Sequence, residues 1–217
     1  MTLFKRNQVE EAISRVVAPT EGTPPANLLN QLKRLLDADR KLGRDPRSKD
    51  PEKLTYAFYS GSASGSGVEV WFREYEAFAL LTALKFLEHG FPQQKSVLAL
   101  RTVRHLLEQE HARILQLDPK ILFDQEAITL AARPGQLAVS STDPVFLVIS
   151  TEREARSKVG SGRPIKSLDV CRGEAEMMRA LKATLGPKTI FEIVMIVHEL
   201  HHYLLTTEPS QRGRAAS

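Results

Sequence analysis

The sequence predicts a mainly α-helical fold with one β-hairpin, followed by a small C-terminal domain that is α/β or mainly α. Three observations lead to this fold class. Before residue 118, several segments repeat apolar residues at helical spacing. Within that part, residues 56–72 have the strand–turn–strand pattern of a hairpin. Beyond residue 118, Pro, Gly and Ser interrupt the pattern until an apolar run of strand length appears.

Composition places the chain among globular proteins. It has 217 residues, of which 42% are hydrophobic, which is enough to bury a core. The sequence contains no apolar run of membrane-spanning length, and its first residues lack the apolar stretch of a signal peptide. Cys171 is the single cysteine, so an intramolecular disulfide and a cysteine-based zinc site are excluded. We expect a cytoplasmic protein without a membrane partner.

The first two helices are predicted over residues 7–17 and 26–42. Apolar residues recur every three or four positions in both segments. Pro24 and Pro25 in the intervening loop prevent the first helix from continuing. Gly43 directly follows the second segment, in the position of a C-terminal helix cap.

The hairpin is predicted from two arms, residues 56–60 and 68–72, which are rich in aromatic and β-branched residues. Between them lies a tip of Gly, Ser and Ala over residues 61–67. Such a tip has free backbone angles and no bulky side chain. It can therefore reverse the chain and approach a phosphate backbone closely.

The remaining elements follow from the same two periodicities. Helices are predicted over residues 73–90 and 92–115, each with a broad apolar face. The continuous apolar run 145–150 predicts a strand. Two more helices are expected over about 170–185 and 190–206. We expect two domains, 1–118 and 119–207, and a disordered tail over 208–217.

Positive charge gathers in one part of the chain. The whole sequence carries a net charge of +4, which permits nucleic-acid binding without requiring it. Between Lys33 and Lys53, eight basic residues stand against five acidic ones. A solvated helix and loop of mixed charge would have a similar composition, so the distribution supports a binding surface only together with the fold.

The order helix, turn, helix, hairpin, helix, helix over residues 5–115 resembles the DNA-binding domain of MerR-type winged-helix regulators. The most similar part is VEVWFREYEAFALLTALKFLEHGFPQQKSVLALRTVRHLL, which has Arg73 and Tyr75 near the end of the wing. The resemblance implies a winged helix-turn-helix fold and binding to double-stranded DNA. It also implies that residues 26–42 form the recognition helix and residues 61–67 the tip of the wing.

The resemblance and the charge pattern together predict a dimeric, DNA-binding transcriptional regulator that needs no cofactor. Its site residues fall into three groups. The expected base-reading residues are Asn27, Asn30 and Gln31. Ser62 and Ser64 belong to the wing. The expected phosphate or groove contacts are cationic: Lys33, Arg34, Arg40, Lys41, Arg44, Arg47 and Arg73.

The main alternative is a zinc-dependent metallopeptidase. His198, Glu199 and His202 form an H-E-x-x-H string on a predicted helix. Histidines four residues apart share a helix face and can hold one Zn²⁺, while the glutamate polarises the metal-bound water. A third ligand would have to come from elsewhere, for instance from Glu174 or Glu176. The other histidines of the long helix, His105 and His111, are expected at the surface.

A non-catalytic protein-interaction module is the third possibility. In that case the hairpin and the basic segment would contact a protein partner instead of DNA. Binding of neither zinc nor DNA would favour it.

Overall fold

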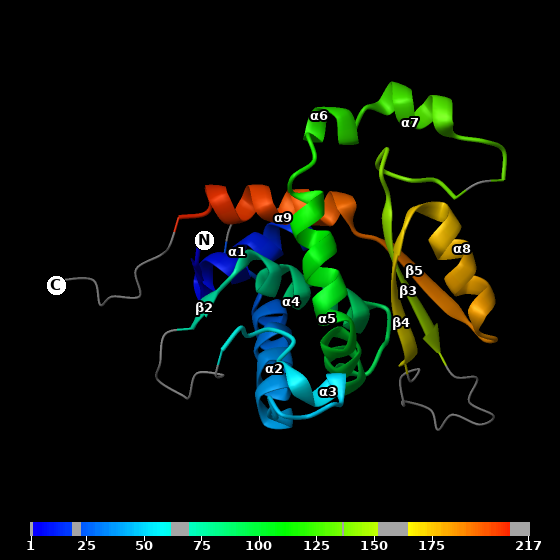
Figure 1. Ribbon diagram of the computed structural model, residues 1–217. Coiled ribbons are helices and arrows are strands. Elements are labelled where there is room, and N and C mark those ends of the chain that lie inside the picture. Colours follow the sequence, from blue (N-terminus) through cyan, green and yellow to red (C-terminus); the bar gives the residue numbers. More distant parts are fainter. Residues whose placement is uncertain (1, 19–22, 62–69, 136, 152–164, 209–217) are drawn as a thin grey trace.

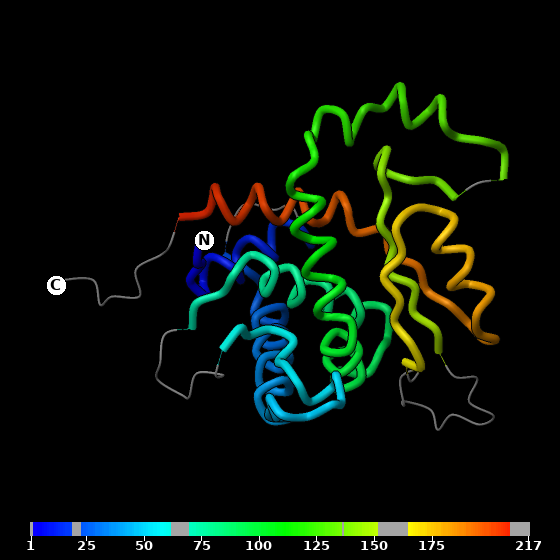
Figure 2. The backbone as a smooth tube through the Cα atoms, viewed as in Figure 1, coloured from blue at the N-terminus to red at the C-terminus, as the bar shows by residue number. Residues whose placement is uncertain are grey.

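The computed structural model describes residues 2–18, 23–61, 70–135, 137–151 and 165–208. A mainly helical body packs against one face of a three-stranded antiparallel sheet, and one helix covers the other face (Figure 1). The backbone trace shows the C-terminal helix returning to the N-terminal one (Figure 2). The mainly α-helical class with small β elements is thereby confirmed.

The helical body is built around α4 (Glu74–Glu88), in which residues 75–84 and Phe86 are all buried. A helix that is apolar on every side needs neighbours on every side. The neighbours are α1 (Arg6–Val17), α2 (Ala26–Leu42), α5 (Gln93–Ile114) and α9 (Val194–Thr206). The ranges predicted for α1, α2, α4 and α5 are confirmed to within about two residues.

The sheet has β3 (Val145–Thr151) at its centre, between β4 (Ile165–Arg172) and β5 (Lys188–Glu192). All seven residues of β3 are buried. Its alternate side chains contribute to two different cores, one shared with the helical body and one shared with α8 (Gly173–Ala183). The apolar run 145–150 is therefore confirmed as a strand, and it is continuous because both faces are covered.

Three short helices complete the described part: α3 (Pro51–Leu54), α6 (Pro119–Leu122) and α7 (Gln125–Ala131). An aspartate caps the N-terminus of each by accepting hydrogen bonds from backbone N–H groups. The segment α6–α7 links the end of α5 to the sheet (Figure 1).

The helical body and the sheet share one hydrophobic core. A single buried cluster runs from Phe4 through α4 and α5 to β3 and to Leu204 of α9. In addition, α9 packs along α1, at the other end of the chain. The larger buried cluster therefore includes residues on both sides of the expected boundary at residue 118. The expected tail falls mostly on 209–217, outside the described residues.

Two predicted helices begin later than expected. Residues 170–172 belong to β4 and residues 190–192 to β5, because both segments pair with β3 before the helices start. Gly173, with φ of 70°, stands at the change from β4 to α8. The carboxylate of Glu192 does not cap a helix but accepts hydrogen bonds from Ser140 N and Ser141 Oγ.

The predicted pairing of the hairpin arms is wrong. Residues 56–60 form no strand, and β2 (Trp71–Phe72) pairs instead with β1 (Phe4–Lys5). The tip lies mostly outside the described residues. The aromatic side chains of 56–60 are mostly buried, as expected for a strand, but backbone hydrogen bonds to another strand are replaced by bonds to side chains.

Arg101 of α5 holds the end of α2 and the connector that follows it. Its guanidinium donates to Asp39 Oδ1 at 2.7 Å, to the Asp39 carbonyl at 2.6 Å, and to the carbonyls of Gly43 and Glu52 at 2.8 and 2.9 Å. Four carbonyl and carboxylate contacts satisfy a group that would be very costly to bury unpaired. The charged connector is thereby fixed against α5.

The Asp39 carboxylate also holds the segment that was expected as a strand. It accepts hydrogen bonds from Ala57 N at 3.1 Å and Phe58 N at 3.0 Å. Burial raises the pKa of Asp39 above its ordinary value, while Arg101 and the two N–H groups oppose this shift. A buried carboxylate with these partners takes the place of a partner strand.

Arg104, one turn further along α5, binds the opposite side of the same segment. Its guanidinium donates to the carbonyls of Tyr56, Ala57 and Tyr59 and lies 3.6 Å from the Glu76 carboxylate. The backbone of this segment is thus hydrogen-bonded on both sides without a β-ladder. Its conformation depends on two arginines of one helix.

We predict that Asp39→Ala lowers the free energy of unfolding by about 3–5 kcal/mol, because it leaves Arg101 buried without its counter-charge. Urea unfolding measures the change. Asp37→Ala is a matched control on the same helix, since Asp37 and its partner Arg40 are 35% and 39% exposed, against 0% and 1% for the buried pair. We expect the control to lose less than about 1 kcal/mol. Equal losses in both variants would contradict the central role of Asp39.

Candidate nucleic-acid interface

The outward side of α2 carries the residues predicted to read bases and to contact phosphates. Leu28, Leu32 and Leu35 point into the core. The predicted site residues of α2 lie off this apolar face, where Asn27, Asn30, Lys33, Arg34 and Lys41 are exposed and Gln31 and Arg40 are half-buried. A single helix therefore presents amides in its first half and mostly cations in its second half.

The surface around the end of α2 is more positive than the sequence count indicates. The segment 33–53 has eight basic and five acidic residues. The structure removes one carboxylate, that of Asp39, into the buried pair with Arg101. All eight basic side chains remain at least partly exposed, whereas only four of the five carboxylates do. We call this segment together with Asn27, Asn30 and Gln31 the basic strip.

Several cations of the strip are available for a ligand. Within the described residues, the side chains of Lys33, Arg34, Lys41 and Arg47 form no ion pair. Arg40 forms a partly exposed pair with Asp37. The guanidinium of Arg44 lies over the Tyr56 ring, with its central carbon 5.6 Å from the ring centroid, and it remains exposed.

The structure does not place every predicted contact in this strip. Arg73 stands between β2 and α4, where it is half-buried and its N–H donates to Glu76 Oε2 at 2.8 Å. It therefore belongs to another element of the fold. Ser62 and Ser64 lie outside the described residues. The basic strip of α2 and its connector is the part of the predicted site that the structure brings together.

The H-E-x-x-H string lies on α9, where its members have different surroundings. His198 is turned inward, with its ring 5.4 Å from that of Phe123, and its Nε2 is buried with no hydrogen-bond partner among the described residues. Glu199 and His202 are exposed. Within the described residues, no group of three or more His, Cys, Asp or Glu side chains is arranged to hold a metal. The zinc alternative stays a prediction, which metal analysis of the purified protein would test.

The neighbouring His201 has a partner that the motif does not explain. Its Nδ1 bonds the carboxylate of Glu74 at the start of α4. His201 thus contacts α4, and His198 contacts the end of α6. Their contacts are consistent with packing of the last helix onto the body.

The expectation that His111 lies at the surface is wrong. Only 4% of it is exposed, and its ring packs beside those of Tyr75 and Phe78, with centroid distances of 5.9 and 5.1 Å. Burial lowers the pKa of His111 to about 4, and the nearby His201 and His198 act in the same direction. His111 is therefore neutral at physiological pH.

The buried charged residues of α5 were also missed from the sequence. Arg101 and Arg104 lie three apart among Val97, Leu100 and Val103 on the inward side of the helix. Cations that fall in phase with an apolar stripe are a detectable signal for buried ion pairs. The partner of each cation is not visible in the sequence, because Asp39 and Glu76 lie on other helices.

Comparison of the chain with models of protein families, with curated proteins and with solved structures finds no match in any of the three. The described helices include none with the length and apolar character needed to span a membrane. A functional assignment therefore rests on the geometry of the chain itself.

We predict that the chain loses stability as the pH falls from 6.5 toward 4, and that His111 causes about 3 kcal/mol of this loss. Above pH 6.5 the imidazole is neutral in both states and contributes nothing to the pH dependence. Between the two pKa values, only the unfolded chain binds the proton, so unfolding becomes easier. Urea unfolding at pH 7.5 and 4.5 measures the change.

His111→Leu should flatten this pH dependence, whatever its effect on the stability at pH 7.5. The control is His105→Leu on the exposed side of the same helix, which should leave the pH dependence as in the wild type. An unchanged slope in His111→Leu would show that another group titrates.

Proposed function

We propose that this chain binds double-stranded DNA through the basic strip and acts as a transcriptional regulator. The observation that carries the proposal is the arrangement of α2. Its predicted site residues lie off the buried apolar face, and one of the two acids of α2, Asp39, is buried while the other, Asp37, is paired with Arg40. This arrangement supports a surface that attracts phosphates along its second half.

The dimensions of α2 fit a DNA groove. A helix of 17 residues is about 25 Å long. The major groove admits one α-helix, and asparagine and glutamine side chains pair well with adenine edges there. Asn27, Asn30 and Gln31 are suited to this role, while cations such as Lys33 and Arg34 are suited to phosphate contacts.

The strip is held in position before any ligand binds. Leucines anchor the inner face of α2, and Arg101 binds the connector through the carbonyls of Gly43 and Glu52. Arg44 and Arg47 in the connector therefore project from a fixed backbone. Preorganised cations lose less conformational entropy on binding than those of a mobile tail, which supports affinity.

The proposal includes a homodimer. One copy of the strip can neutralise only a few phosphates, and a two-fold pair doubles the set of contacts. Sedimentation velocity of the full chain, with and without a DNA duplex, measures the number of copies. If the chain binds DNA as a monomer, the proposed binding surface stands and the proposed homodimer is wrong.

We predict that Lys33→Glu with Arg34→Glu weakens DNA binding at least tenfold and lowers the salt slope, the change in log affinity per change in log salt, by about two. The reason is that each lost phosphate contact removes about one released counterion. Fluorescence anisotropy of mixed-sequence duplexes at two salt concentrations measures both quantities.

The matched control is Lys120→Glu with Lys182→Glu, on α6 and α8. Both lysines are exposed and lie on other elements, so the double variant has the same net charge without changing the strip. We expect at most a threefold effect on affinity. An equal loss in both double variants would show a non-specific effect of net charge, and unchanged binding in the first would reject the surface.

A further inference from the structure

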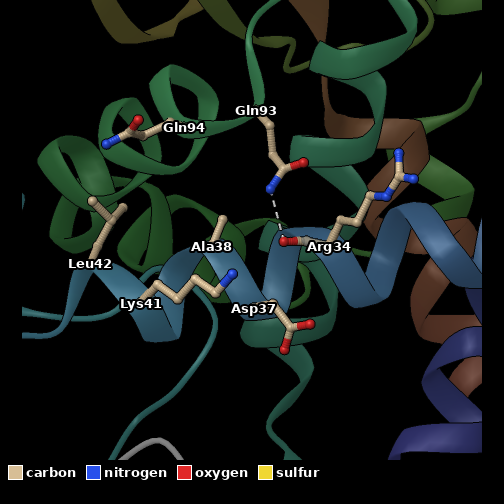
Figure 3. A pocket seen from close by; sticks show the side chains of 7 residues that line it. All are labelled: Arg34, Asp37, Ala38, Lys41, Leu42, Gln93 and Gln94. Carbon is tan, nitrogen blue, oxygen red and sulfur yellow. Dashed lines mark hydrogen bonds between the residues drawn. The ribbon is translucent and has the colours of Figure 1, made fainter.

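A cavity of about 440 Å³ lies between the second half of α2 and the start of α5 (Figure 3). Arg34, Asp37, Ala38, Lys41 and Leu42 line it from α2, and Gln93 and Gln94 from α5. Pockets for small organic ligands measure about 300–1,000 Å³. The cavity is therefore larger than a single ion requires, and it accommodates a small organic molecule.

The charged groups of the cavity favour an anion. Within the described residues, neither Arg34 nor Lys41 forms an ion pair. The cavity also contains Asp37, but one oxygen of its carboxylate is bonded by Arg40. Two cations without an ion pair thus line the cavity together with one carboxylate whose charge is already compensated, which suits a phosphate.

The rest of the lining offers hydrogen bonds and an apolar surface. Gln93 Nε2 donates to the carbonyl of Arg34 at 2.9 Å, which fixes this amide across the cavity and leaves its oxygen as an acceptor (Figure 3). Gln94 has no hydrogen-bond partner among the described residues. Ala38 and Leu42 supply an apolar patch between the polar groups. A flat ring with polar edges matches this combination.

We propose that the cavity binds a nucleoside monophosphate. Arg34 and Lys41 contact the phosphate, the two glutamine amides contact polar edges of the base, and Ala38 with Leu42 packs against a ring face. The second oxygen of Asp37 remains able to accept a bond from a sugar hydroxyl. This site needs no DNA and would exist in a protein with a different function.

The same two cations belong to the basic strip. A nucleotide in the cavity would neutralise Arg34 and Lys41, so it should compete with DNA; this consequence rests on the proposed function. Small-molecule control of DNA binding would then arise from shared residues, without a conformational change.

Isothermal titration calorimetry of the full chain with adenosine, guanosine, cytidine and uridine monophosphates tests the site, with inorganic phosphate as a separate titrant. We expect one nucleotide per chain. Lys41→Gln should weaken binding at least tenfold. Lys33→Gln is the matched control, an exposed lysine of the same helix outside the cavity, and should change affinity less than threefold.

Ala38→Phe fills the cavity without changing charge and should abolish nucleotide binding, with circular dichroism confirming that the variant is folded. Three results would overturn the proposal: no saturable binding of any nucleotide, equal weakening by the two lysine variants, or phosphate binding as tightly as a nucleotide. Nucleotide binding without DNA binding would keep this site and reject the proposed function. DNA binding without nucleotide binding would do the reverse.

Discussion

Arg101 and Asp39 form a buried ion pair that connects the end of α2, the connector after it and the segment at residues 57–58. No β-ladder holds these three parts together. The guanidinium holds the end of α2 and the connector after it, and the carboxylate holds the segment at Ala57 and Phe58. A buried pair contributes little net stability but is costly to break, because either member alone is an unpaired buried charge. The path of residues 43–58 over α5 therefore depends on this pair together with the bonds of Arg104.

The same contact links the core to the proposed function. Burying Asp39 removes a negative charge from the outward surface of α2 and fixes the cations of the connector. Arg101 and Arg104 are cations as well, but they lie in phase with the apolar side of α5 and are fully engaged inside. Net charge counts both sets equally. Only the phase of each residue relative to the apolar stripe decides whether a cation holds the fold or faces a ligand.

Helices of the body could be predicted from the sequence because their apolar periodicity is strong. For α2 the predicted bounds, 26–42, equal those of the structure. The strand at 145–150 was also predictable, since a short apolar run bounded by turn residues is typical of a strand that is covered on both faces. The pairing at 56–60 was not, because an aromatic, half-buried pattern fits a strand and equally fits a segment whose backbone is bonded by Arg104. The buried position of His111 depended on Tyr75 and Phe78 of another helix.

The candidate site divides in the same way. Local spacing placed Asn27, Asn30 and Lys33 off the buried face of one helix, and this could be read from the sequence. The cavity beside them could not, because it needs Gln93 of α5 next to Arg34 of α2, a contact between residues 59 positions apart. Helical spacing also places His198 and His201 on the side of α9 that packs on the body, where His198 contacts Phe123 and His201 contacts Glu74. A motif defined by spacing alone therefore fits packing as well as it fits metal binding, and the groups on neighbouring helices decide between the two.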